Sequence, residues 1–169
     1  MPTPQPAIFR ENTPHHYFLE FHLRPGWRQD ALKRSLAAAL DACPAETSVL
    51  LAFGRDAWER LAPDAVPDNF IAFHAVLGQQ DRTAPGTQGD LLFWLHGERH
   101  DLNLQCALAI GRALAGIATL ELELHGFRHL DSRDLTGFID GTANPQGEEA
   151  RAAALIPAGM TGAAGSFVL

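Results

Sequence analysis

The chain has 169 residues, with 20 acidic and 13 basic side chains, a formal charge of −7 and a hydrophobic fraction of 46%. This length supports one domain with a hydrophobic core of its own, and the composition excludes disordered and collagen-like chains. The acidic excess opposes nonspecific binding to nucleic acid, because such binding depends on basic side chains that neutralise phosphates.

Cysteine usage and the N-terminal sequence predict a cytoplasmic protein. Cys43 and Cys106 lie far apart without a CxxC pair, so we expect two reduced thiols rather than a disulfide or a zinc site. The proline-rich N-terminus lacks the charged start and apolar run of a signal peptide. No apolar stretch approaches the roughly 18 residues that cross a bilayer, so we expect no membrane partner.

The first third of the chain predicts a strand followed by a helix. Residues 1–14 are rich in proline and predict a flexible lead. Residues 15–24 alternate between large apolar and polar side chains, which is the period of a strand. Residues 30–43 predict a helix, because leucines recur at helical spacing and Pro44 follows the end.

The middle of the chain is less regular. Residues 47–53 form a short apolar run that predicts a strand, and residues 56–61 predict one or two helical turns with Asp56 as the N-cap. Residues 62–88 contain several prolines and glycines and predict a long surface loop. The apolar patch at 70–76 inside that loop is either an edge strand or a buried anchor.

Three further elements complete the predicted fold. Residues 90–96 are apolar on both faces, which is typical of a central strand in a sheet covered on both sides. Residues 102–114 predict a helix, and residues 118–125 alternate leucine with polar residues as a strand does. The order strand, helix, strand, strand, helix, strand predicts an α+β, ferredoxin-like (split βαβ) plait with an antiparallel sheet.

The chain therefore divides into three predicted parts. Residues 1–14 form the lead, and residues 15–127 form the ferredoxin-like domain. Residues 128–169 form a long loop in which residues 165–169 open a further strand. A loop of this length is typically functional or disordered.

The most informative stretch of that loop reads Gly137-Phe-Ile-Asp-Gly-Thr-Ala-Asn-Pro145. Glycines around an aspartate permit a tight turn or a close approach to a bound group, so a plain Asp-Gly turn is one interpretation. A calcium loop is excluded, because Pro145 stands at its sixth position and Arg151 at its twelfth. A phosphate-binding loop is excluded by the absence of a Gly-Lys-Ser/Thr sequence.

Segment 137–145 closely resembles the GxxDG signature of the dye-decolorizing peroxidases, in the longer form GFxDGxxNP. The resemblance covers most of the chain from His15 onward, and a member of this family consists of two ferredoxin-like halves with a b-type haem between them. The predicted plait agrees with the first half. The flanking stretches that also resemble the family are 49–54, 96–103, 125–128, 133–137, 147–149 and 165–168.

The resemblance implies a haem-dependent peroxidase, in which hydrogen peroxide is reduced while a dye, phenolic or porphyrin-like reducing substrate is oxidised. Asp140 aligns with the distal aspartate, whose implied role is to take a proton from iron-bound peroxide and return it to the departing oxygen. The residues implied to line the distal side of haem b are Phe138, Ile139, Gly141, Thr142 and Asn144.

The sequence departs from the family pattern in one large respect. The proximal histidine and the distal arginine belong to the second half, which would begin near Gly165, so we expect no iron ligand within this chain and weak or no activity from it alone. Among the histidines, His22, His96 and His125 lie on three predicted strands and could share one face.

Two other functions remain open on the sequence. The chain could be a non-catalytic or split half that acts as a haem-binding or assembly module, either with a complementary second half or with itself as a homo-oligomer. It could also be a plain ferredoxin-like ligand-binding dimer in which Asp140 is only a turn residue.

Overall fold

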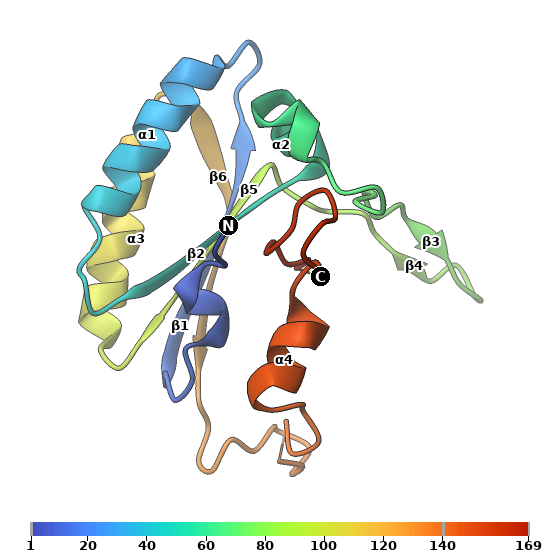
Figure 1. Cartoon of the computed structure of the whole chain (residues 1–169). Helices are drawn as coiled ribbons and strands as arrows, with labels where there is room; N and C mark the ends of the chain where they lie inside the picture. Colours follow the sequence, from blue (N-terminus) through green and yellow to red (C-terminus); the bar gives the residue numbers. More distant parts are fainter. Residues whose placement is uncertain (1, 140, 169) are drawn as a thin grey trace.

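A four-stranded antiparallel sheet forms the centre of the computed structural model, which describes residues 2–139 and 141–168 (Figure 1). The sheet has the order β2-β5-β1-β6, in which the strands are β1 (His15–Leu23), β2 (Ser48–Phe53), β5 (Leu91–Gly97) and β6 (Ala118–Phe127). The helices α1 (Gln29–Asp41) and α3 (His100–Leu114) lie side by side over one face, which we call the helix face. This arrangement confirms the predicted ferredoxin-like fold.

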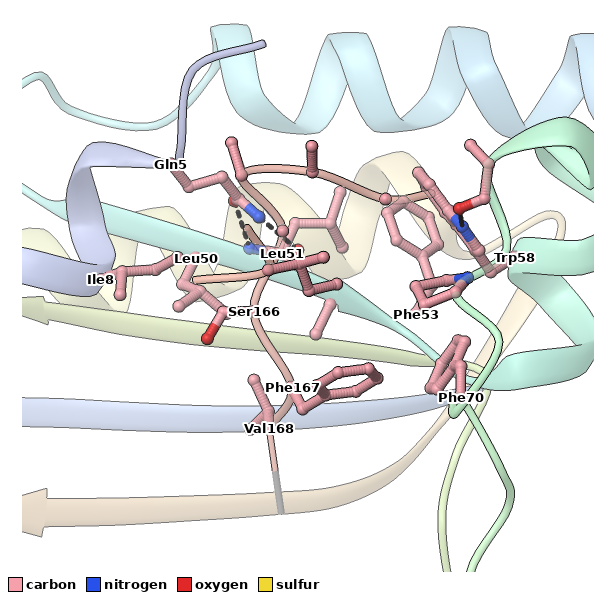
Figure 2. A pocket seen from close by; sticks show the side chains of 18 of the residues that line it. Gln5, Ile8, Leu50, Leu51, Phe53, Trp58, Phe70, Ser166, Phe167 and Val168 are labelled. Atoms are coloured by element: carbon pink, nitrogen blue, oxygen red, sulfur yellow. Dashed lines mark hydrogen bonds between the residues drawn. The ribbon is translucent and has the colours of Figure 1, made fainter. Parts of the chain in front are cut away.

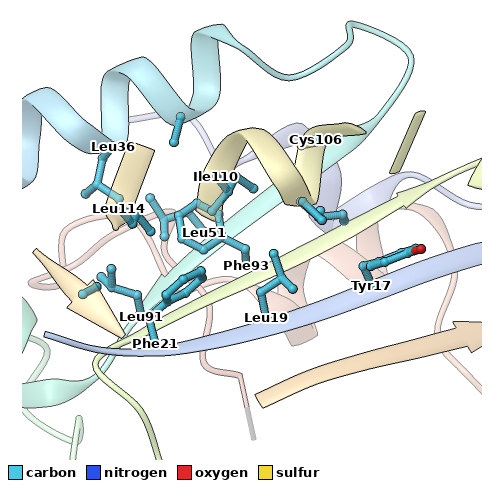
Figure 3. Packing of buried hydrophobic residues seen from close by; sticks show 14 of the residues in the cluster. Tyr17, Leu19, Phe21, Leu36, Leu51, Leu91, Phe93, Cys106, Ile110 and Leu114 are labelled. Atoms are coloured by element: carbon cyan, nitrogen blue, oxygen red, sulfur yellow. The ribbon is translucent and has the colours of Figure 1, made fainter. Parts of the chain in front are cut away.

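The core lies between that face and the two helices (Figure 3). Tyr17, Leu19 and Phe21 of β1 point into it, because alternate residues of a strand share a face. The alternation seen in the sequence therefore matches burial. The other core residues include Leu91, Phe93 and Leu95 of β5 and Leu32, Leu36, Ile110 and Leu114 of the helices. Strand β5, which is apolar on both faces, lies between β2 and β1 inside the sheet, as predicted.

The opposite face of the sheet, which we call the outer face, carries His16, Phe18 and Glu20 of β1. Its β2 side is covered by the short 3-10 helix η1 (Pro6–Phe9) and by the C-terminal part of the chain (Figure 1). The Gln5 side chain accepts a hydrogen bond from the Leu51 N–H (2.9 Å) and donates one to the Leu51 carbonyl oxygen (2.8 Å). The segment predicted to be a flexible lead is thus anchored to the sheet edge.

A β-bulge changes the side-chain pattern of β6. Glu20 faces Leu122 but Phe21 faces Leu120, so Glu121 is the extra residue. Leu120 consequently lies on the helix face, whereas Leu122 and Leu124 lie on the outer face. Strict alternation predicted all three leucines on one face, and the bulge overturns that prediction.

The segment between β2 and β5 differs from its prediction in detail. Helix α2 (Arg55–Leu61) begins after Gly54, so Asp56 lies in the first turn and is not the N-cap. The loop contains the 3-10 helix η2 (Pro63–Ala65) and a small hairpin of β3 (Val76–Leu77) with β4 (Thr83–Ala84). Within the predicted patch at 70–76, Ile71 and Phe73 are exposed and belong to no strand.

Near the C-terminus, the helix α4 (Gly147–Ala154) was not predicted, and residues 165–168 form no strand. Its polar first turn, Glu148 and Glu149, gives α4 little apolar periodicity to detect. None of the helices in the described ranges is both long and apolar enough to pass through a bilayer.

The prediction of two reduced thiols was wrong, because Cys43 and Cys106 form a disulfide. Helices α1 and α3 pack against each other, and this packing brings the two Cα atoms to 4.5 Å although 63 positions separate them in the sequence. Sequence spacing alone contains no sign of that proximity. The bond ties the segment just after α1 to the buried side of α3.

Candidate functional site

The loop that carries the motif is folded back on itself. Arg133 and Ile139 face each other as an antiparallel bridge. The Asp134 N–H donates to the Phe138 carbonyl oxygen at 2.9 Å, and the Gly137 N–H donates to the Asp134 carbonyl oxygen at 3.1 Å. Residues 133–139 therefore form a tight turn that ends directly before the aspartate of the motif.

The Asp134 carboxylate fills the inside of this turn. Its Oδ1 accepts hydrogen bonds from the Thr136 N–H (2.9 Å), the Thr136 hydroxyl (2.7 Å) and the Phe138 N–H (3.1 Å). These donors, the Thr136 side chain first, lower the pKa of Asp134, because they stabilise the ionised form. Gly137 has a φ of +95°, a conformation that side chains disfavour.

Arg133 secures the turn from outside. Its guanidinium donates to the Gly137 carbonyl oxygen at 2.7 Å and makes two hydrogen bonds, of 2.8 and 3.1 Å, to the Asp131 carboxylate. The same contact lowers the pKa of Asp131. Three neighbouring positions, 131, 133 and 134, thus shape the loop through their side chains, and sequence reasoning did not single them out for this role.

The structure describes five of the six predicted site residues. The side chains of Phe138 and Ile139 point out of the turn, with Phe138 74% exposed, and Thr142 is largely accessible. Gly141 has a φ of +77°, and a Cβ there would lie 3.2 Å from Asn144 Nδ2. Asn144 also donates its N–H to the Gly141 carbonyl oxygen at 3.1 Å.

Asp140, the predicted catalytic residue, lies outside the described residues. The residues around it fit one face of a flat apolar group with polar edges. Phe138 and Ile139 supply exposed apolar surface, Gly141 has no side chain that would keep a bound group from the backbone, and the amide of Asn144 supplies donors. Within residues 2–139 and 141–168, no three His, Cys, Asp or Glu side chains gather closely enough to hold a metal ion.

The three strand histidines are not brought together. His125 faces Tyr17 on the helix face, with ring centroids 4.1 Å apart, and its Nε2 lies 2.8 Å from Glu123 Oε1. His22 and His96 lie on the outer face, each near the C-terminal end of its strand. Because β1 and β5 run antiparallel, His96 faces His16 and lies at the other end of the sheet from His22, whose Nδ1 is 3.6 Å from Asp90 Oδ2. His125 is separated from the other two by the face of the sheet on which it lies, and His22 is separated from His96 by their positions along the sheet.

His96 instead has a buried environment of its own. Its Nδ1 accepts from the Thr13 hydroxyl (2.9 Å), its Nε2 donates to the Ala7 carbonyl oxygen (3.1 Å), and its ring stacks on His16 at 5.8 Å. Burial lowers the pKa of His96, and the neighbouring His16 lowers it further. Burial also lowers the pKa of His16.

We expect the fold to lose stability as the pH falls below about 6.5, the ordinary pKa of histidine. The folded-state pKa values of His96 and His16 are lowered, so the unfolded chain binds more protons below that pH and the stability present above it is lost. The loss is at most about 1.4 kcal/mol per pH unit for each histidine, because each can bind no more than one extra proton in the unfolded chain. Urea unfolding at pH 7.5 and 5.5 measures it, and His96→Gln, which keeps a donor and an acceptor, should flatten the slope. The exposed His74→Gln is the control; an equal slope in all three proteins would contradict this prediction.

A cavity of about 380 Å³ lies on the β2 side of the outer face (Figure 2). It has a largely apolar lining from the N-terminal segment, β2, α2, residues 65–70, Ile156 and residues 162–168. Phe70 and Phe167 face each other across it, with ring centroids 5.9 Å apart. Because its walls come from segments that are far apart in the sequence, no sequence pattern indicates it.

Comparison with known proteins accounts for nearly the whole chain. The model of the family described as "Dyp-type peroxidase, N-terminal" matches residues 5–128, and "Dyp-type peroxidase, C-terminal" matches residues 131–169. Dye-decolorizing peroxidases of Mycolicibacterium paratuberculosis and Mycobacterium tuberculosis are each 42% identical over 100 residues, which is 59% of this chain.

Solved structures show the same similarity in three dimensions. A DypB variant from Rhodococcus jostii in complex with heme is 29% identical, with a TM-score of 0.79 over 94% of this chain. The encapsulated DyP-type peroxidase from Mycobacterium smegmatis is 34% identical, with a TM-score of 0.76 over 87%. The chain spans about half the length of these structures (53% and 49%), and the matched segment is 28% and 30% of the two curated relatives.

Proposed function

Because this chain belongs to the Dyp-type peroxidase family, we propose that it supplies the distal side of a haem pocket in a peroxidase. The observation that carries the proposal is the turn at residues 133–139. Its side chains fix the backbone on both sides of Gly137, directly before the apolar side chains of Phe138 and Ile139. The family matches and the heme-bound relative support the same assignment.

Each predicted site residue has a role in this proposal. Phe138 and Ile139 would pack on the apolar face of haem b, and Gly141 would let the backbone approach it closely. Thr142 and Asn144 would offer polar groups at its edge. The proximal iron ligand would come from a complementary second half, because relatives are about twice as long as this chain.

Bound haem would supply the iron at which hydrogen peroxide is reduced. Asp140 would take a proton from the peroxide and return it to the departing oxygen, so that the O–O bond breaks with the loss of water. This role requires an ionised carboxylate when peroxide arrives. The reducing substrate would be a dye, a phenolic compound or a porphyrin-like donor.

We also propose the division of the chain into residues 1–14, 15–127 and 128–169. The match to the N-terminal family model ends at residue 128 and the match to the C-terminal model begins at residue 131, which supports the boundary before residue 128. A cytoplasmic location stays a prediction. It rested partly on reduced thiols, and the Cys43–Cys106 bond removes that support.

Haem binding tests the proposal directly. Titrating the purified chain with haemin should give a Soret band that saturates at one haem per chain. Phe138→Ser should weaken the band, because it removes apolar contact area, whereas Phe73→Ser, at an exposed site of another loop, should not. Absence of a Soret band at stoichiometric haemin would overturn the proposal for this chain.

Adding hydrogen peroxide and a dye to the loaded protein separates the two functions that remain open. Dye oxidation supports the peroxidase. A Soret band without dye oxidation supports a haem-binding or assembly module, which the exposed leucines of β6 independently favour. A turnover that requires an added second half would support the split-enzyme form of the proposal.

A further inference from the structure

Residues 2–13, which we call the strap, precede β1 and cover the β2 side of the outer face (Figure 1). The structure describes every residue of the strap, and only Ala7 and Thr13 are buried. The half-exposed Phe9 lies under the Arg151 guanidinium of α4, 4.9 Å from the ring centroid. Because so little apolar surface is buried, specific contacts must hold the strap on the sheet.

The two buried strap residues are the two that His96 binds. The His96 Nε2 donates to the Ala7 carbonyl oxygen at 3.1 Å, and its Nδ1 accepts from the Thr13 hydroxyl at 2.9 Å. His96 itself is 1% exposed and belongs to β5, inside the sheet. The carbonyl can only accept, so the hydrogen of the neutral ring lies on Nε2 and both nitrogens are satisfied. One imidazole therefore fixes the strap at two points.

The other attachments of the strap lie at the surface. Gln5 pairs with the main chain of Leu51, and Arg10 donates to the Glu46 carbonyl oxygen (3.0 Å) and to the Ser48 hydroxyl (2.9 Å). Both strap side chains are exposed, so water can replace their hydrogen bonds at little cost. The buried contacts of His96 are therefore the ones that we expect to decide whether the strap stays closed.

The surroundings of His96 oppose a positive charge. Its ring lies 5.8 Å from that of His16 and 4.8 Å from that of Trp94. Burial lowers the pKa of His96, and His16 on β1 and Arg10 in the strap lower it further, whereas β2 places the uncharged Ser48 opposite it. Among the described groups that act on the imidazole there is no carboxylate. A protonated His96 would thus be a buried cation without an anionic partner, which is costly, and leaving the strap would expose it to water.

We propose that His96 is a pH-sensitive latch that holds the strap closed, and that the strap detaches from the sheet in mildly acidic solution while the sheet and helices stay folded. Thr3, Gln5 and Ile8 of the strap line the cavity beside β2, so its release would remove one wall of that cavity. The inference does not depend on haem binding or peroxidase activity.

Hydrogen exchange of the Leu51 amide tests the latch. The Leu51 N–H donates to Gln5 Oε1, so its exchange reports whether the strap is attached. After correction for the intrinsic effect of pH, its protection should fall about tenfold from pH 7.5 to 5.5. The reason is that the open form binds one more proton below about 6.5, the ordinary pKa of histidine.

The buried Phe93 amide, at the centre of β5, separates release of the strap from unfolding. At both pH values Leu51 should be less protected than Phe93. Its exchange should also respond little to low concentrations of urea, because only the strap opens.

Replacing the latch residue removes the pH dependence. His96→Gln keeps a donor for the Ala7 carbonyl oxygen and an acceptor for the Thr13 hydroxyl but does not titrate. Leu51 should therefore have the same protection at pH 7.5 and 5.5 in this variant. His22→Gln is the matched control, because it removes a histidine from the same face of the sheet at a side chain that is 49% exposed. It should keep the tenfold change.

Thr13→Val tests the geometry of the latch without removing the histidine. It deletes the donor to Nδ1, so the protection of Leu51 at pH 7.5 should fall about fivefold, the usual effect of one hydrogen bond. Thr3→Val, at an exposed position of the same strap, should leave it unchanged. Circular dichroism of each variant shows whether it is folded.

Three results would each overturn the proposal. Equal protection of Leu51 and Phe93 would show that the strap opens only when the whole fold does. Wild-type protection of Leu51 that is the same at pH 7.5 and 5.5 would show that no histidine controls the strap. An unchanged Leu51 in folded Thr13→Val would show that the buried contacts of His96 do not hold it.

Discussion

Replacing Asp140 with asparagine is expected to lower the rate of peroxide-dependent dye oxidation by the haem-loaded protein, assayed together with a complementary second half, by about 10²–10⁴-fold, the usual contribution of general acid–base catalysis. Asparagine has almost the size of aspartate but neither accepts a proton nor returns one at the pH of the assay. The haem band should saturate as in the wild type, because Asp140 is proposed to act on peroxide rather than to hold the cofactor.

The measurement is the steady-state rate at saturating peroxide, together with the Soret spectrum of each protein. Asp68→Asn, an exposed aspartate in the 62–88 loop, provides the control for loss of one negative charge. An Asp140→Asn protein that binds haem and keeps the wild-type rate would show that this residue is only part of a turn. That outcome would support the plain ligand-binding dimer left open by the sequence.

Breaking the Cys43–Cys106 bond is expected to lower the free energy of unfolding by about 4 kcal/mol. The bond closes a loop across 63 sequence positions, and on the loop-entropy model its loss returns that much conformational freedom to the unfolded chain. Urea unfolding with and without a thiol reductant measures the difference. Because Cys106 is fully buried, prolonged incubation with reductant is needed before the measurement.

The double variant Cys43→Ala and Cys106→Ala provides the control, because its unfolding curve should not respond to reductant. Free thiols detected in the native wild type, together with an unfolding curve that reductant does not move, would contradict the bond. That result would also restore the sequence-based expectation of two reduced cysteines.

The sequence predicts the ferredoxin-like fold well, since the fold depends on periodicity within single elements. Tyr17, Leu19 and Phe21 alternate because one face of β1 is buried, and β5 is apolar on both faces because it lies inside the sheet. Such signals need no knowledge of neighbouring strands. They were sufficient for the order of the main strands and helices.

What the sequence did not predict depends on relations between elements. The bulge at Glu121 puts Leu120 on the helix face through its pairing with β1. The histidines are kept apart by strand pairing, which sets both the face of His125 and the distance along the sheet between His22 and His96. The disulfide follows from the packing of α1 on α3. For the candidate site, the motif was visible, but the turn that supports it involves Asp134, whose role follows only from three contacts of its carboxylate.

That turn has a consequence for the order of events during folding. The side-chain bonds that shape it join residues two to four positions apart, so they require no contact with the sheet. Closing a loop of about ten residues takes roughly 10–100 ns, far less than assembling an antiparallel sheet from distant strands. The turn at residues 133–139 can therefore form before the domain does, and the entropy of ordering these residues need not be lost again when a ligand binds.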